Sequence, residues 1–262
     1  MAGFAQRIGR GGRTAALLAA FVCLPGQALL AQRTNVDHPR EYAACMKLAR
    51  EAPEEGFDSA LAWASQGGGE AARHCAAVAL IELGRYEEAA EGLERLAREA
   101  SAAAVKLRPA LLAQSGQAWL LAGKPERAQA VQSAALDLEP DNVEFLIDRS
   151  ITLADTANYW EALDDLNRAL DLAPDRAEAL VLRANAYRYL DSIDLAHDDV
   201  ERALTLDPGN PDGLLERGIL RRLAGDTGGA RSDWIRVLAL APNGPAGDAA
   251  RANLKKLDVI AE

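Results

Sequence analysis

The chain has 262 residues, of which 49% are apolar but only 5% aromatic, and its formal net charge is −10. Alanine and leucine favour helices and make up most of the apolar share, whereas the aromatic and β-branched residues that favour sheets are scarce. The composition therefore predicts an all-α protein. The negative charge argues against binding to nucleic acid or to an anionic membrane surface, since like charges repel.

The N-terminus predicts an export signal. Residues 1–13 contain three arginines and no acid, residues 14–24 are an apolar run, and the small-x-small sequence Gly26-Gln27-Ala28 follows. This order is typical of a secretory signal peptide, and the apolar run is shorter than the roughly 20 residues that span a bilayer. We expect cleavage after Ala28, or as late as Ala31, and a location in the bacterial periplasm with no further membrane contact. The alternative is an uncleaved anchor.

Cleavage would leave two cysteines, Cys45 and Cys75, separated by 30 residues. Two cysteines in an exported protein predict one disulfide bond, which stabilises a loop of this size by roughly 3–4 kcal/mol. The alternatives are two buried thiols or, with His74 as a further ligand, a zinc site. Because the histidines lack the spacing of metal ligands, we expect no metal and no cofactor.

A period of 34 residues is the most informative feature of the sequence. Four similar phrases, LDLEP, LDLAP, LTLDP and LALAP, end at Pro140, Pro174, Pro208 and Pro242. Periods of this length indicate arrays of helices. Small residues recur at fixed distances before each proline, where they allow two helices to approach closely. The columns of small residues include Ala128, Ala162, Ala196 and Ala230, and also Gly116, Ser150, Ala184 and Gly218.

Each unit is predicted to contain two helices joined by a short turn, with the proline ending the second helix because it cannot continue one. Glycines such as Gly123 and Gly225 mark the turns. The period, the small columns and the closing proline together resemble the tetratricopeptide repeat family. The resemblance implies an all-α fold, namely a right-handed superhelix (α-solenoid) of stacked antiparallel helix pairs.

The resemblance covers most of the chain after the signal segment. It divides the chain into a signal peptide (1–28), a linker (29–40), a degenerate first repeat (41–69), further repeats (70–108, 109–142, 143–176, 177–210 and 211–244), and a C-terminal capping helix and tail (245–262). The repeat that ends at residue 108 lacks the closing proline and contains about five extra residues near its end.

Two columns of opposite charge appear together in the last three repeats. Sixteen residues separate each arginine from an aspartate: Arg149 and Asp165, Arg183 and Asp199, Arg217 and Asp233. The upstream repeats lack both members, so we expect structural ion pairs between the two helices of a repeat, because a guanidinium meets a carboxylate through two hydrogen bonds. The alternative is a clamp for an anionic ligand, which the matching aspartates disfavour.

The resemblance also implies a binding surface. In that family the first helix of each repeat lines the concave face, which holds an extended peptide or a helix of a partner. The matching residues here are Gln117 and Leu120, Ile147 and Ile151, Val181, Asn185, Arg188 and Tyr189, and Leu215, Ile219 and Arg222. If this stripe is exposed, Arg188, Tyr189 and Arg222 are the natural anchors, because tyrosine and arginine often dominate interfaces. The alternative is that Ile147, Val181 and Leu215, which recur in one column, pack partly between the repeats.

No motif of a nucleophile, a phosphate-binding loop or a catalytic carboxylate pair appears in the sequence. We therefore expect a non-catalytic scaffold or adaptor of the cell envelope that binds another protein. The alternatives are a chaperone-like holder of exported chains and, less favoured, an enzyme with a cryptic site. The sequence does not indicate the oligomeric state.

Overall fold

The computed structural model describes residues 38–102 and 104–260. The predicted signal peptide and most of the predicted linker lie outside the described residues. Because the first helix begins at His38, the last three residues assigned to the linker are helical. No helix in the described part of the chain is both long and apolar enough to cross a membrane.

The described residues form thirteen α-helices. They are α1 (His38–Glu51), α2 (Pro53–Trp63), α3 (Gly69–Glu82), α4 (Tyr86–Glu99), α5 (Arg108–Leu121), α6 (Pro125–Leu138), α7 (Val143–Asp155), α8 (Tyr159–Leu172), α9 (Ala177–Tyr189), α10 (Ile193–Leu206), α11 (Pro211–Leu223), α12 (Thr227–Leu240) and α13 (Pro245–Ile260). A π-helical turn, Ala64–Gly68, joins α2 to α3, and a 3-10 turn, Val105–Leu107, precedes α5.

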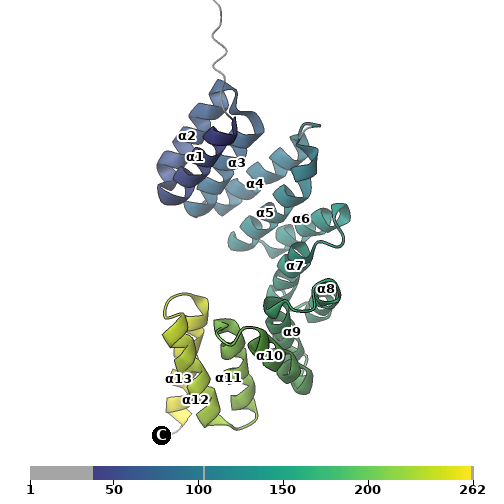
Figure 1. The fold of residues 1–262 in the computed structure, drawn as a ribbon, viewed down its shortest axis with the longest axis vertical. Coiled ribbons are helices and arrows are strands. Elements are labelled where there is room, and N and C mark those ends of the chain that lie inside the picture. The colour runs from purple at the N-terminus through teal and green to yellow at the C-terminus, as the bar shows by residue number, and fades with distance from the viewer. Residues whose placement is uncertain (1–37, 103, 261–262) are drawn as a thin grey trace, which may run out of the picture. The chain divides into compact units, whose positions relative to one another are not determined.

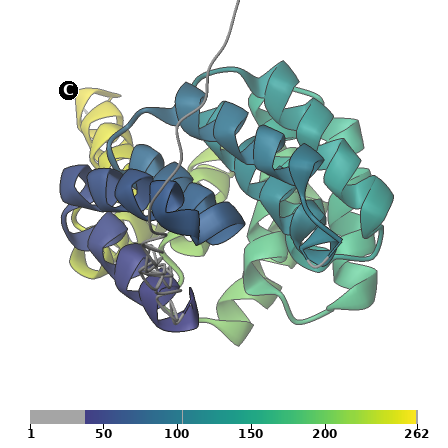
Figure 2. The ribbon, with the colours of Figure 1, turned by 90° about the horizontal axis from the view of Figure 1, so that it is seen from above.

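Each helix packs against the next one along the chain, and the order of neighbours is visible in two perpendicular views (Figures 1 and 2). The first helices of successive repeats also touch one another, as α5 and α7, α7 and α9, and α9 and α11 do. Stacking of this kind buries apolar surface that no single helix pair could cover alone. The predicted all-α solenoid of stacked helix pairs is confirmed.

The prolines end the second helices for a local steric reason. The residue before each proline has φ between −139° and −134° and ψ between 71° and 89°, which lies outside the helical region. Proline disfavours the helical conformation in the residue that precedes it. Each second helix therefore ends at the same position in its repeat.

The turn inside each of the four 34-residue repeats contains a residue with positive φ. Gly123 and Gly225 supply it in two repeats, but Ala157 and Asp191 occupy the same column and also have φ of 59°. A residue with a Cβ atom is strained in this left-handed conformation. The turn geometry is thus kept in repeats where the sequence gives no glycine signal.

Two glycines of the column of small residues lie directly against larger residues of the second helix. A Cβ atom added to Gly218 would lie 2.3 Å from Nε1 of Trp234, and one added to Gly116 would lie 2.4 Å from Cγ of Gln132. Fully buried Val200 belongs to the same larger column. Packing at crystal-like density leaves no room for a large residue on both sides.

The N-terminal helices are tied covalently. Cys45 of α1 and Cys75 of α3 form the predicted disulfide bond, with Cα atoms 6.2 Å apart. Both cysteines are buried in a cluster formed by α1, α2 and α3. The extra residues noted near residue 100 form the connection between α4 and α5.

Candidate functional site

The arginine and aspartate columns meet as bidentate ion pairs in all three repeats. In the middle repeat, Nε and Nη2 of Arg183 on α9 each donate a hydrogen bond of 2.7 Å to Asp199 on α10. The equivalent distances are 2.7 and 2.8 Å for Arg149 with Asp165 and 2.8 and 3.0 Å for Arg217 with Asp233. These hydrogen bonds raise the pKa of all three arginines.

Each arginine also reaches a third helix, which the sequence analysis did not foresee. The Nη1 atom of Arg149 donates to Ser133, that of Arg183 to Asn167, and that of Arg217 to Glu201. These acceptors form a 34-residue column on the second helix of the preceding repeat. The arginines therefore join successive repeats as well as the two helices of one repeat.

The stripe of first-helix residues is only partly accessible, and this corrects the sequence analysis. Ile147 and Val181 are 2% and 7% exposed, because both belong to the core shared by α5 to α10. They cannot contact a partner without unpacking that core. The recurrence of Ile147, Val181 and Leu215 in one column reflects packing between repeats; Leu215 is half-buried against the C-terminal core.

Two polar residues of the predicted stripe, Arg188 and Asn185, are held within the chain. The guanidinium of Arg188 forms a bidentate ion pair with Glu216 of α11, whose side chain is only 5% exposed. Asn185 donates to the same carboxylate at 3.3 Å. Glu216 was not predicted, because its column also contains Gln114, Asp148 and Leu182 and so shows no repeated charge. Arg188 is thus a link between repeats rather than a free cation.

The accessible part of the first-helix face centres on two stacked tyrosines. The rings of Tyr159 and Tyr189 are nearly parallel, with an interplanar angle of 5° and centroids 4.6 Å apart. The guanidinium of Arg188 also lies over the Tyr189 ring, with its carbon atom 4.4 Å from the ring centroid. Tyr189 is nevertheless 56% exposed. Tyr159 was not predicted as a site residue, because the equivalent positions of the next two repeats are Ile193 and Thr227 and the aromatic residue is not repeated.

A groove with a volume of about 460 Å³ lies beside this stack. We call it the tyrosine groove, and it is lined by Leu120, Ile151, Ala154, Asp155, Tyr159, Asn185 and Tyr189. Its walls come from α5, α7, α9 and the first residue of α8. Most of these residues come from the C-terminal halves of first helices, so consecutive repeats build the groove together.

One further carboxylate stands on the same face of α7 as the groove. Asp148 precedes Ile151 by three residues and Asp155 by seven, a spacing that places all three on one side of a helix. Gln117 of α5 donates a hydrogen bond of 2.9 Å to the Asp148 carboxylate. Burial raises the pKa of Asp148, and the nearby carboxylates of Glu144 and Glu178 raise it further, while the Gln117 bond opposes the rise.

The remaining members of the predicted stripe are on α11. Ile219 is half-buried against the C-terminal core, and Arg222 is exposed. These two residues lie one repeat beyond Tyr189 and do not line the tyrosine groove. The structure thus brings together part of the predicted set and leaves α11 outside it.

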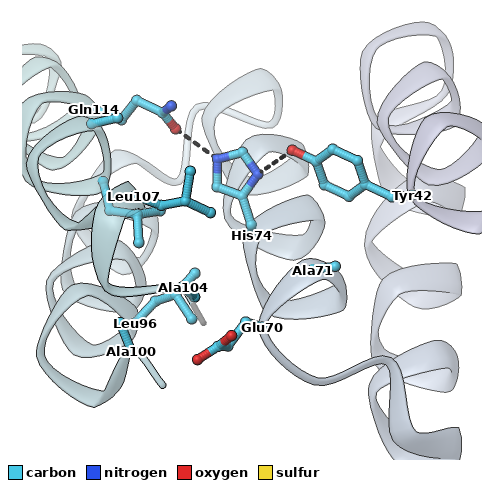
Figure 3. Close-up of a pocket in the computed structure, with 11 residues that line it drawn as sticks. Tyr42, Glu70, Ala71, His74, Leu96, Ala100, Ala104, Leu107 and Gln114 are labelled. Carbon is cyan, nitrogen blue, oxygen red and sulfur yellow. Dashed lines mark hydrogen bonds between the residues drawn. The ribbon is translucent and has the colours of Figure 1, made fainter. Parts of the chain in front are cut away.

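A second cavity, of about 450 Å³, lies between α3 and α5 (Figure 3). Its walls are mainly apolar, and they include Ala71, Leu96, Leu107 and Leu111. At one end three polar side chains form a hydrogen-bonded chain across α1, α3 and α5. Tyr42 Oη lies 2.7 Å from Nδ1 of His74, and Nε2 of His74 lies 2.8 Å from Oε1 of Gln114.

The groups in this cavity are engaged with one another. Both ring nitrogens of His74 are hydrogen-bonded, and the carboxylate of Glu70 accepts from the backbone N–H and the hydroxyl of Ser101. The arrangement therefore ties α1, α3 and α5 together. Among the described residues, no group of three or more histidine, cysteine or acidic side chains could hold a metal ion.

The fold is that of a helical-repeat protein, and its accessible first-helix face carries the stacked tyrosines beside a groove with polar and apolar walls. Comparison with known families agrees with that class, because residues 181–245 match the family described as Tetratricopeptide repeat. The match covers the last repeats of the array, and in that segment the chain is similar to tetratricopeptide repeats. None of the curated proteins compared with the chain matches it.

Several solved structures share the fold. MamA (residues 41 to the end) from Desulfovibrio magneticus RS-1 is 22% identical, with a TM-score of 0.53 over 75% of this chain and 94% of that one. The tetratricopeptide protein TTC0263 from Thermus thermophilus is 20% identical, with a TM-score of 0.58 over 73% of this chain and 100% of that one. A chain of the APC/C hetero-tetramer Cut9–Hcn1 is 16% identical, with a TM-score of 0.63 over 84% of this chain and 43% of that one.

Proposed function

We propose that this protein is an exported scaffold that binds a segment of one partner protein in the tyrosine groove. The observation that supports this most directly is the stack of half-buried Tyr159 on Tyr189, which is 56% exposed and lines a groove together with Ile151. Exposed aromatic side chains held in place by their neighbours are typical centres of protein interfaces.

The groove suits a short stretch of a partner because it is preorganised. The stack and the Arg188–Glu216 ion pair fix both the Tyr189 ring and the adjacent helix, so little side-chain entropy is lost on binding. Leu120 and Ile151 add half-buried apolar surface on the two preceding first helices. A partner's peptide or helix that crosses α5, α7 and α9 would cover all of these side chains.

Export to the bacterial periplasm is part of the proposal, and two features support it. Residues 1–28 have the order of a signal peptide, as argued above. The disulfide between Cys45 and Cys75 also fits a compartment in which disulfides persist. Cell fractionation, together with the mass of the mature protein before and after reduction, tests both points. A full-length, reduced protein in the cytoplasm would contradict this part of the proposal.

The partner site is tested by site-specific photo-crosslinking in cells. A photoreactive phenylalanine analogue replaces Tyr189, and the same analogue replaces Leu195 as a control, because Leu195 is a similarly exposed apolar residue on the second helix α10. We expect one crosslinked partner from position 189 and none of it from position 195. The crosslink at position 189 should disappear when Ile151→Glu is added, because a charge then replaces an apolar wall of the groove.

Two outcomes would count against the proposal. Equal crosslinking from both positions would show that the tyrosine groove is not the site. A ladder of many unrelated exported proteins from position 189 would instead favour the chaperone-like holder. In both cases circular dichroism of the variants must show unchanged helix content, so that unfolding does not explain the result.

A further inference from the structure

We infer that the partner segment is basic, with lysine or arginine next to the apolar or aromatic residue that covers the tyrosine groove. This inference rests on the proposed function and specifies the chemistry of the partner. The charges on the accessible part of the first-helix face support it.

The cations on this part of the face are already neutralised. Arg188 is paired with Glu216, and the ion pair lies between α9 and α11. Arg176, at the other end of α9, is paired with Glu144 and Glu178. A carboxylate in the partner would therefore find no available guanidinium at the groove. Arg222 is exposed but stands one repeat away, on α11.

Two carboxylates, in contrast, have no cation within the described residues. The Asp148 carboxylate accepts a hydrogen bond from the uncharged amide of Gln117. Asp155 is exposed, lines the groove, and forms no ion pair or hydrogen bond with a side chain in the described part of the chain. Both lie on the same side of α7 as Ile151, so the acids flank the apolar wall.

Asp148 is unusual because its position is unfavourable in the isolated protein. Its carboxylate is partly buried, it gains only one neutral hydrogen bond, and its acidic neighbours Glu144 and Glu178 share Arg176 between them without bringing that cation into an ion pair with Asp148. A buried charge is normally paired, because desolvation is costly otherwise. A cation from outside the chain would supply the missing partner for Asp148, and Asp155 would bind it at the exposed edge of the groove.

The overall charge acts in the same direction. The formal net charge of −10 attracts a basic segment at long range and repels an acidic one. Complementary charge raises the rate of association and discriminates against wrong partners more than it raises affinity. The expected occupant therefore combines an apolar or aromatic side chain on Tyr159 and Tyr189 with a basic side chain on Asp148 and Asp155.

Selection from a random library of displayed twelve-residue peptides tests this inference without knowledge of the natural partner. The full chain is immobilised, and selection is repeated with three variants. These are Tyr189→Ala, Asp148→Asn/Asp155→Asn, and the control Asp164→Asn/Asp198→Asn, which makes the same charge change at two exposed positions on second helices. Synthetic versions of the enriched peptides are then measured by fluorescence anisotropy at low and high salt.

We expect enriched peptides that contain lysine or arginine beside an apolar or aromatic residue. Their affinity should fall about tenfold in Asp148→Asn/Asp155→Asn and should change little in the control, because two lost ion pairs at a half-buried site correspond to roughly one factor of ten. High salt should weaken binding to the wild-type chain and narrow its difference from the variant.

The outcomes separate this inference from the proposed function. Acidic or neutral peptides that depend on Tyr189 would overturn the inference and leave the proposed function standing. Basic peptides that bind Asp148→Asn/Asp155→Asn as well as the wild type would also overturn the inference. Failure to enrich any peptide, or binding that is indifferent to Tyr189→Ala, would overturn both.

Discussion

The ion pair between Arg183 and Asp199 offers a quantitative test of how the array is held together. In Arg183→Met, the Asp199 carboxylate would lose both of its short hydrogen bonds and stay in a place where its side chain is 9% exposed. Removing one partner of a buried ion pair typically costs about 3–5 kcal/mol. Since the Arg183 side chain is itself 19% exposed, water relieves some of this cost, and we expect a loss of about 3 kcal/mol.

The double variant Arg183→Met/Asp199→Leu gives the decisive comparison. It removes the stranded charge together with its partner, and replacing a buried pair by apolar residues is often neutral or stabilising. We therefore expect the double variant to be more stable than Arg183→Met by at least about 2 kcal/mol. Arg202→Met is the matched control, because Arg202 is 48% exposed and should contribute less than about 1 kcal/mol.

Urea unfolding followed by circular dichroism measures these differences. Repeat arrays can unfold in more than one stage, so the midpoint and the slope of each transition are compared separately. Two results would refute the reasoning: a loss below about 1 kcal/mol in Arg183→Met, or a double variant that is no more stable than the single one. Peptide binding at a temperature where Arg183→Met is folded should be unchanged, because Arg183 does not line the tyrosine groove.

Three further substitutions test packing, backbone strain and charge. Gly218→Ala should lower the free energy of unfolding by about 1–3 kcal/mol in the same assay, because its Cβ would lie 2.3 Å from Nε1 of Trp234. Ala157→Gly should raise it by about 0.5–1 kcal/mol, because glycine relieves the strain of a positive φ of 59°. Asp148→Asn should stabilise the fold at neutral pH, because the folded-state pKa of Asp148 is raised and its ionised form is the destabilised one. That gain should shrink as pH falls through the raised pKa and vanish below the ordinary value of 3.8, when Asp148 is protonated in both states.

The first two of these predictions have a control variant in the same chain, and the third is controlled by its pH dependence. Gly228→Ala adds a Cβ whose nearest contact, Asp226, is at an ordinary 3.8 Å, so a loss of stability equal to that of Gly218→Ala would contradict the packing argument. Ala122→Gly changes a turn residue with φ of −75° and should not stabilise the fold. A gain from Asp148→Asn that persists at acid pH would contradict the charge argument.

The sequence allowed the fold to be predicted because the same local causes repeat every 34 residues. Prolines end the second helices, and small residues lie where the two helices of a repeat approach each other. The arginine and aspartate columns keep a constant separation of sixteen residues. Where one repeat uses a different residue for the same geometry, as Ala157 does in place of glycine, the pattern is weaker but the backbone is unchanged.

The site was only partly predictable, because periodicity identifies a face of a helix but not the depth of each residue on it. Ile147 and Ile151 are one helical turn apart in one repeat, yet the first is buried in the core and the second lines the groove. A contact that occurs at only one boundary between repeats leaves no 34-residue pattern in the sequence, so periodicity cannot predict it. Tyr159 with Tyr189 and Arg188 with Glu216 are of this kind, and they define the site.

Each repeated arginine forms a hydrogen bond with the preceding repeat, and this contact affects how the number of repeats could change. Within a repeat, the fit between Gly218 and Trp234 is specific to one pair of residues. Between repeats, by contrast, the arginines donate to a serine, an asparagine or a glutamate, because each of these side chains has an oxygen that can accept the hydrogen bond. Deleting residues 177–210 would bring Arg217 to the position from which Arg183 now reaches Asn167. The boundaries between repeats are thus the positions at which a whole 34-residue repeat could be deleted, duplicated or exchanged while the arginine contacts are kept.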